Sequence, residues 1–243
     1  MTKKRVYLPA IIGFVLIVLS ILAAMSGPIG SRIGWWDFDY AVAIAKWSAY
    51  VAIFAALLCF SGLFFARPGS NRRGFIISLL GIILFIPMLL FLQSWKEAKL
   101  TSPPIQDITT TTENLPTFWY APNSRDYGGD PVAALQEEFY PDIKPLILPV
   151  TMDKAFDLSV ALIKDRGWQL WTPSRDEMHI EATQKTFWFG FSDDVVIHIT
   201  KIDQNSSRID MRSTSRFGGG GDGGTNANRI RSFFEDLKGH IQQ

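Results

Sequence analysis

The sequence predicts a membrane-anchored α+β protein. Three transmembrane helices precede a two-layer domain, in which an antiparallel sheet of about five strands packs on two helices. Residues 1–93 contain three long apolar runs, and residues 151–243 contain closely spaced strand-like runs between two amphipathic helices. The two parts also differ in charge: residues 1–93 hold eight Lys/Arg and two Asp/Glu (+6), whereas residues 94–243 hold sixteen Lys/Arg and twenty-one Asp/Glu (−5).

The apolar runs are each long enough to cross roughly 30 Å of hydrocarbon as a helix. We place the three spans at about residues 6–25, 41–65 and 74–92. The first run resembles a secretory signal peptide at its start, and Ala23, Ala24 and Ser26 leave cleavage open. However, the apolar core of a signal peptide is usually about 7–15 residues long, and this run has about 20. We therefore expect a retained helix.

Two basic clusters predict the orientation of these spans. Lys3, Lys4 and Arg5 precede the first span, and Arg67, Arg72 and Arg73 stand between the second and third. Because cytoplasmic loops are enriched in Lys and Arg, both clusters are expected in the cytoplasm. The sequence thus predicts a multi-pass protein of the bacterial inner membrane, with a cytoplasmic N-terminus and a periplasmic C-terminal domain.

A lysine interrupts the second span. Lys46 lies near the start of that span, where a lysine side chain can extend to the membrane interface. The spans contain no second charge to pair with it and show no repeats, so a small carrier is the last-ranked reading. The single cysteine, Cys59, excludes a disulfide within the chain.

Residues 94–150 are predicted to form an extended, proline-rich strap. Residues 101–150 contain eight of the thirteen prolines, which disfavours long helices and central strands. The aromatic residues Phe118, Trp119 and Tyr120 make the segment too apolar for a solvated linker. We expect the strap to lie across the following domain, with a short helix near residues 131–139.

Residues 151–243 are predicted to form the periplasmic α+β domain. Thr151 is a candidate N-cap for a helix over 152–166, and apolar residues at helical spacing predict a second helix over 226–241. Strand-like runs separated by short polar turns predict an antiparallel meander. These runs cover residues 168–171, 177–183, 186–191, 195–200 and 208–214. Phe187, Phe189 and Phe191 are expected in the core, with Trp188 facing outward.

Three segments of the polar part resemble a known bacterial family, the domain of unknown function 1499. The resemblance covers roughly residues 103–237. It rests on three motifs in the same order along the chain. They are residues 104–110, then Glu181–Thr183 with Phe189–Val195, and then Arg212–Arg216 with Asp222, Gly224, Asn226, Arg229 and Ile230. It implies a bacterial envelope protein of uncharacterised activity. It brings no catalytic residues, and it does not imply the membrane spans.

The segment 208–231 is the strongest candidate ligand site. A strand leads into a glycine-rich loop, and a helix opens at Asn226; such a loop and a helix N-terminus can present N–H groups to an anion. The alternative is a flexible turn beside a solvated face. The loop lacks the Lys-Ser/Thr of a nucleotide P-loop and the βαβ setting of a dinucleotide site. The predicted ligand-binding residues are Arg212, Arg216, Gly220, Asp222, Gly224, Asn226 and Arg229.

The remaining acidic residues and histidines could in principle be catalytic or bind a metal, but we expect structural roles for them. Asp193 and Asp194 could act as a pair of catalytic acids with Asp222, but we expect a hairpin turn at residues 192–194. His179 and His198 could share a metal, yet exposed strand positions are the simpler reading. No Gly-x-Ser-x-Gly elbow occurs. We predict no catalytic residues, no metal and no cofactor.

The expected function is that of a binding module. The partners predicted are the lipid bilayer and an envelope protein or an anionic ligand such as an anionic lipid. The acidic polar domain argues against nucleic-acid binding, which requires a basic surface. The alternative is a membrane-bound enzyme that acts on an envelope substrate.

Overall fold

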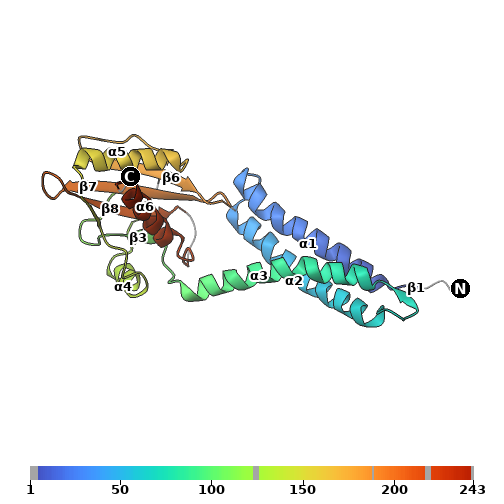
Figure 1. The fold of residues 1–243 in the computed structure, drawn as a ribbon. Helices are drawn as coiled ribbons and strands as arrows, with labels where there is room; N and C mark the ends of the chain where they lie inside the picture. Colours follow the sequence, from blue (N-terminus) through green and yellow to red (C-terminus); the bar gives the residue numbers. More distant parts are fainter. Residues whose placement is uncertain (1–4, 123–125, 188, 217–219, 242–243) are drawn as a thin grey trace. The chain divides into compact units, whose positions relative to one another are not determined.

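The computed structural model describes residues 5–122, 126–187, 189–216 and 220–241 (Figure 1). The chain forms two compact units. The first contains Met1–Glu97 and Phe187–Gly190, and the second contains Ala98–Thr186 and Phe191–Gln243. The predictions made for Lys3, Lys4 and Trp188, and for the part of the glycine-rich loop at Gly218 and Gly219, lie outside the described residues.

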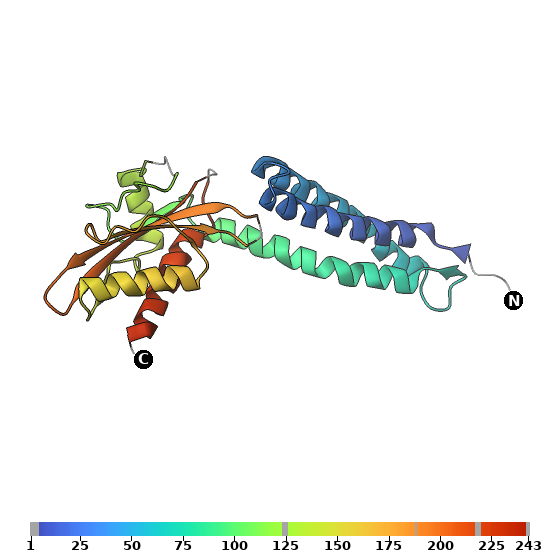
Figure 2. The ribbon, with the colours of Figure 1, turned by 90° about the horizontal axis from the view of Figure 1, so that it is seen from above.

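Three helices dominate the first unit: α1 (Leu8–Arg32), α2 (Phe38–Phe65) and α3 (Phe75–Thr101). All three are long and apolar enough to cross a membrane. Helices α1 and α2 lie side by side (Figures 1 and 2). Small residues permit this close packing, as in many membrane helix pairs. A Cβ atom on Gly13 would lie 2.8 Å from the carbonyl oxygen of Ala55.

Helix α1 continues seven residues beyond the predicted span end at Met25. Gly27, Pro28 and Gly30 lie beyond that predicted end, and glycine and proline usually end helices. In the structure these glycines serve close contacts. A Cβ atom on Gly27 would lie 2.9 Å from the Ala41 carbonyl oxygen, and one on Gly30 would lie 2.1 Å from the ring of Trp36. The close contacts that these glycines permit therefore outweigh their low helix propensity, and α1 continues through them. Helix α3 likewise continues from residue 92 to Thr101.

The second unit contains the predicted antiparallel sheet. Its six strands are β3 (Asp107–Thr109), β4 (Leu146–Leu148), β5 (Gln169–Leu170), β6 (His179–Lys185), β7 (Ser192–Lys201) and β8 (Ser207–Ser215). The order across the sheet is β3-β8-β7-β6-β5, and β4 also pairs with β8. All of these pairings are antiparallel, which confirms the predicted fold class.

Helices α5 (Met152–Asp165) and α6 (Thr225–Ile241) pack on one face of this sheet (Figure 1). The predicted N-cap of α5 is confirmed, since the Thr151 side chain accepts a hydrogen bond from the Lys154 N–H at 3.3 Å. The core between the layers includes Phe156, Ile197 and Phe233, all at most 4% exposed. Burying each such side chain contributes about 1.5–3 kcal/mol.

The predicted strand over residues 186–191 is wrong. Residues 186, 187 and 189–191 belong to neither β6 nor β7, and the Thr186 N–H donates to the Phe191 carbonyl oxygen at 2.8 Å. Phe187 is 76% exposed rather than in the core. Aromatic residues favour strands only where the sheet offers a surface to bury them.

The proline-rich strap contributes more regular structure than predicted. Strands β3 and β4 both come from it, and the short helix expected near residues 131–139 is present as α4 (Asp130–Phe139). The segment before α4 crosses the sheet on the side opposite α5 (Figure 2). The sheet is therefore covered on both faces.

Candidate functional site

Asp193 and Asp194 do not lie in a turn. Both belong to β7, where neighbouring side chains point to opposite faces. Asp193 faces α6 and Asp194 faces the strap side, and they are 2% and 0% exposed. The sequence prediction failed because carboxylates are rarely buried unless they are paired. Each aspartate has such a partner, contributed by a distant part of the chain.

Arg216 pairs with Asp194 on the strap side of the sheet. Its Nε and Nη2 atoms donate to the two carboxylate oxygens at 2.7 Å each. Thr183 on β6 completes the group, since its hydroxyl donates to Asp194 at 2.6 Å and accepts from Arg216 at 2.9 Å. Trp171 also donates its indole N–H to Thr183 at 2.9 Å. A planar, two-pronged pair of this kind is strong and geometrically specific.

Arg212 forms a second pair on the same face. Its Nε and Nη2 atoms donate to Asp107 on β3 at 2.8 and 2.7 Å, and both side chains are 6% exposed. The guanidinium carbon lies 5.4 Å from the centre of the Phe118 ring and 5.8 Å from that of Tyr127. The strap aromatics thus enclose the pair. Burial and the charge of Asp107 raise the pKa of Tyr127, although the Arg212 charge opposes them.

Arg229 on α6 pairs with Asp193 on the helix side. Its Nη2 donates to Asp193 at 2.5 Å, and its Nη1 donates to Ser213 at 2.9 Å. Its remaining donors reach the side-chain oxygens of Asn226 and Gln184. Burial raises the pKa of Asp193, and the neighbouring Arg229 charge lowers it by less, so the net pKa is raised. The desolvation of this carboxylate is therefore incompletely offset.

Asp222 caps helix α6. Its two carboxylate oxygens accept hydrogen bonds from the N–H groups of Gly224 and Asn226, at 2.8 and 2.7 Å. Asn226 is fully buried, and its amide nitrogen donates to the Gln106 carbonyl oxygen at 3.0 Å. The Asn226 N–H, which the anion-site prediction relies on, is thus directed at a carboxylate of the chain itself.

The structure gives internal partners to six of the predicted ligand residues, which are Arg212, Arg216, Asp222, Gly224, Asn226 and Arg229. Arg212, Arg216 and Arg229 face three different aspartates, on two faces of the sheet. An anion bound by these arginines would have to displace a buried carboxylate. Gly220 and Gly224 adopt positive φ angles of +101° and +82°, the backbone conformation for which glycine is suited. The anion site remains a prediction.

Sequence reasoning named Glu181 only as part of a resemblance and did not predict its role, because it is completely buried on the strap side of β6. Its carboxylate accepts hydrogen bonds from three successive strap N–H groups: Trp119 at 2.6 Å, Tyr120 at 3.1 Å and Ala121 at 2.7 Å. His179 Nε2 lies 2.8 Å from the same carboxylate. The position of Glu181 between the apolar residues Ile180 and Ala182 was a weak signal that its carboxylate is buried.

These contacts determine the state of the Glu181 carboxyl group. Burial raises its pKa, but the hydrogen bonds from His179 and from the three strap N–H groups together outweigh burial, so the net pKa is lowered. The Trp119 ring stacks on His179 with a centroid distance of 3.7 Å and an angle of 8°. His179 is therefore 2% exposed, contrary to the exposed position expected for it. His198 is its cross-strand neighbour and is exposed.

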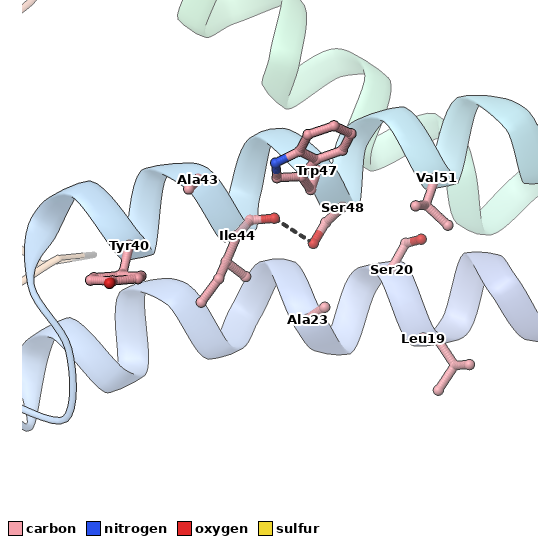
Figure 3. Close-up of a pocket in the computed structure, with 9 residues that line it drawn as sticks. All are labelled: Leu19, Ser20, Ala23, Tyr40, Ala43, Ile44, Trp47, Ser48 and Val51. Atoms are coloured by element: carbon pink, nitrogen blue, oxygen red, sulfur yellow. Dashed lines mark hydrogen bonds between the residues drawn. The ribbon is translucent and has the colours of Figure 1, made fainter.

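The described part of the chain contains at least two hollows. An apolar groove of about 430 Å³ runs between α1 and α2 (Figure 3). Ser20 lines it with a buried hydroxyl that has no hydrogen-bond partner among the described residues, whereas Ser48 donates to the Ile44 carbonyl oxygen at 2.7 Å. A second hollow, of about 150 Å³, adjoins Gln106, Asp107, Asp126 and Gly220. Within the described residues, no group of three or more His, Cys, Asp or Glu side chains converges.

Comparison with protein families gives a match. A family model with the description "Protein of unknown function (DUF1499)" matches residues 107–237, which is more than half of the chain. The match includes the three aspartate–arginine pairs and Glu181. No curated protein matches the chain.

Proposed function

This chain belongs to the DUF1499 family of proteins of unknown function, and from that premise we propose that it is a membrane-anchored binding protein. In this proposal its three apolar helices cross the bacterial inner membrane. Its second unit lies in the periplasm and binds a partner protein without catalysing a reaction. The arginines in the described α2–α3 loop support the orientation, because Arg67, Arg72 and Arg73 would then be cytoplasmic.

The observation that carries the binding proposal is an exposed aromatic pair on the strap. Trp119 and Tyr120 are each 49% exposed, and their rings meet edge to face with a centroid distance of 6.4 Å. Trp and Tyr are typical of the residues that dominate binding energy at protein interfaces. The backbone N–H groups of both residues are bound to Glu181. Their backbone is therefore fixed before a partner arrives, which lowers the entropic cost of binding.

The enzyme alternative receives less support from the geometry. Its candidate carboxylates, Asp193, Asp194 and Asp222, are used by two buried ion pairs and a helix cap, and none of them lines either hollow. Asp193 does have a raised pKa, but it is 2% exposed and bound to Arg229. A substrate could not reach it without opening the interface between α6 and the sheet.

Site-specific photo-crosslinking in intact cells tests the proposal. A photoreactive residue at Tyr120 of the full-length chain is expected to give a discrete adduct with a second protein. The matched control carries the same residue at Ile202, which is 50% exposed in the turn between β7 and β8. Equal adduct patterns from the two positions, or no adduct from Tyr120, would contradict a docking role for the aromatic pair.

A phosphate titration tests the anionic ligand separately. If the predicted anion site operates, phosphate should shift the amide resonances of Gly220–Arg229 in the full-length chain. Asp222→Ala should strengthen such binding, because it removes the carboxylate that accepts from the Gly224 and Asn226 N–H groups. Unchanged resonances would contradict the predicted anion site.

A further inference from the structure

A pair of short parallel strands brings basic residues from two distant segments together in the first unit. The strands are β1 (Arg5–Val6) and β2 (Arg72–Arg73), and the register places Arg5 directly opposite Arg72. The pair lies at the end of the helices where α2 leads into α3 (Figure 1). The fold thus joins the basic segment before α1 to the arginine loop before α3.

Two arginines project side by side from one face of the β1–β2 pair. Residues directly opposite each other in a sheet share a face, and neighbouring strands are about 4.8 Å apart. Arg5 and Arg72 are such residues, whereas Arg73 lies opposite Val6 and projects from the other face. Like charges in directly opposite positions destabilise strand pairing. An anion bound between Arg5 and Arg72 would remove this repulsion.

Aromatic rings position two of the guanidinium groups at this end of the unit. The Arg72 guanidinium carbon lies 5.3 Å from the centre of the Tyr7 ring and 5.9 Å from that of the Phe65 ring. The Arg67 guanidinium carbon lies 5.9 Å from the centre of the Phe64 ring. These contacts involve ring faces and not hydrogen-bond acceptors. They restrict the two side chains and leave their N–H donors available to a ligand.

The arginines have no acidic partner near them. The four at this end of the unit are Arg5, Arg67, Arg72 and Arg73. All four are exposed, and none forms an ion pair with another described residue. The acids of residues 1–93 are Asp37 and Asp39, at the opposite end of α2. Because a helix rises about 1.5 Å per residue, Asp39 lies roughly 40 Å from the arginines along α2.

The position of the cluster favours a lipid headgroup as the anion. Arg5 precedes α1 by three positions, Arg67 follows α2 by two, and Arg73 precedes α3 by two. If these helices span a bilayer, as proposed above, the arginines lie at the level of the lipid phosphates. Basic clusters next to membrane spans bind anionic headgroups. The rings of Phe64 and Phe65 are 64% and 50% exposed, and they suit acyl chains better than they suit a nucleic acid.

We propose that the face of the β1–β2 pair that carries Arg5 and Arg72 binds the phosphate group of an anionic phospholipid. The phosphate oxygens accept hydrogen bonds from both guanidinium groups, for which the planar fork of arginine is suited. The exposed phenylalanine rings contact the first part of the acyl chains. This proposal rests on the membrane location proposed above and not on the aromatic pair of the strap.

Native mass spectrometry of the full-length chain in detergent tests the proposal. Phosphatidylglycerol and phosphatidylcholine with identical acyl chains are titrated separately, because these two lipids differ in the net charge of the headgroup. Phosphatidylglycerol is expected to bind about tenfold more tightly, since the arginines lack other counter-charges. Arg72→Gln should weaken phosphatidylglycerol binding about fivefold, which is the effect of one arginine at an anionic lipid surface.

Two further variants separate the site from general charge attraction. Arg73→Gln is the matched control, because it removes an exposed arginine from the opposite face of the same strand pair; it should weaken binding by less than about twofold. Arg72→Lys keeps the charge and loses the planar fork, so its affinity should lie between those of wild type and Arg72→Gln. Both positions are exposed, and circular dichroism checks that the variants retain their helices.

The proposal is overturned if the two lipids bind equally or if Arg73→Gln weakens binding as much as Arg72→Gln. Glycerophosphoglycerol, the same headgroup without acyl chains, tests the source of the phosphate: affinity equal to that of phosphatidylglycerol would assign the site to a soluble phosphate ester and overturn the lipid assignment. Displacement of phosphatidylglycerol by an equal concentration of a short oligonucleotide would overturn it in favour of nucleic acid.

The result is independent of the proposed topology, because a chain in detergent has no cytoplasmic or periplasmic side. Topology is measured separately, by labelling of introduced cysteines in spheroplasts. A chain that has the proposed topology but does not prefer phosphatidylglycerol would contradict the lipid site alone. A chain that prefers phosphatidylglycerol in the Arg72-dependent manner supports the lipid site, whichever way its helices are found to cross the membrane.

Discussion

At the scale of single residues, the second unit is organised by charges that are buried and paired. Arg212 and Asp107 lie 105 positions apart in the chain, and Arg229 and Asp193 lie 36 apart. Strand alternation predicts the face on which a side chain of a strand lies, but it does not predict which partner a fold brings there. For this reason the sequence identified the arginines as notable residues and assigned them to a ligand.

Removing one member of the buried Asp107–Arg212 pair should be costly. We expect Arg212→Met to lower the free energy of unfolding by about 3–5 kcal/mol, because it leaves an uncompensated buried carboxylate. The double variant Asp107→Leu/Arg212→Met should lose less than the sum of the single variants. Urea unfolding of the full-length chain in detergent measures this. Lys144→Ala is the control: its pair with Glu137 is solvent-exposed, and exposed pairs contribute about 0–1 kcal/mol. A strictly additive cycle would contradict coupling between the two side chains.

Glu181 should make the stability of the strap depend on pH. Its pKa in the fold lies below the ordinary value of 4.5, so the charged form stabilises the fold fully above about pH 4.5. That contribution is lost as the pH falls through the lowered pKa. Glu181→Gln should cost about 2 kcal/mol or more at pH 7, because hydrogen bonds to a charged acceptor are lost.

The comparison across pH isolates this residue. The stability difference between wild type and Glu181→Gln should shrink as the pH falls below about 4.5. The raised pKa of Asp193 makes its contribution to stability change with pH in the opposite direction to that of Glu181. Because Asp193 is present in both proteins, its contribution cancels in the difference. Glu177→Gln, which changes an exposed acid just before β6, is the control. A difference that stays constant with pH would exclude the charged carboxylate as the group that holds the strap.

At the level of helices and strands, the local sequence pattern predicted the helices of the second unit and its three long strands, β6, β7 and β8. Helix α5 has its Thr151 cap, and α6 has the apolar stripe expected of it. The strands β3 and β4 were missed because they are three residues long and come from a proline-rich segment. Both strands pair with β8, which is far away in the sequence, and whether a segment forms a strand depends strongly on the neighbour that it pairs with.

The edge strand β3 is protected by a side chain. Gln136 on α4 accepts from the Thr109 N–H at 2.9 Å and donates to the Thr109 carbonyl oxygen at 2.7 Å, as a neighbouring strand would. Gln136→Ala should therefore destabilise the unit by about 1–3 kcal/mol, since both buried backbone groups lose their partner. Glu138→Gln on the same helix should have little effect on urea unfolding. Equal stabilities of the two variants would contradict this role.

The glycine-rich loop offers a matched pair of substitutions. Gly220 and Gly221 both have positive φ angles, +101° and +95°. A Cβ atom on Gly221 would lie 2.7 Å from the Pro103 carbonyl oxygen, whereas one on Gly220 meets nothing within 4 Å. Gly221→Ala should thus destabilise the unit more than Gly220→Ala, because only the former adds a clash to the backbone strain. Equal losses in thermal unfolding would show that close approach is not the reason for Gly221.

At the scale of the whole chain, composition predicted the architecture most securely. Three apolar helices and a polar α+β unit follow from hydropathy and from the uneven charge of residues 1–93 and 94–243. Composition gives no ligand, because a binding site depends on a few atoms whose positions are determined only by the fold.

We propose that three helices hold the second unit on the far side of a bacterial membrane from the arginine loop. The most direct measurement is labelling of introduced cysteines with an impermeant maleimide in spheroplasts, in a Cys59→Ala background that removes the single native thiol. We predict that Asn205→Cys, in the β7–β8 turn, is labelled at once and that Ser70→Cys, in the arginine loop, is labelled only after permeabilisation. Labelling of Ser70→Cys in intact spheroplasts, with Asn205→Cys protected, would contradict the account.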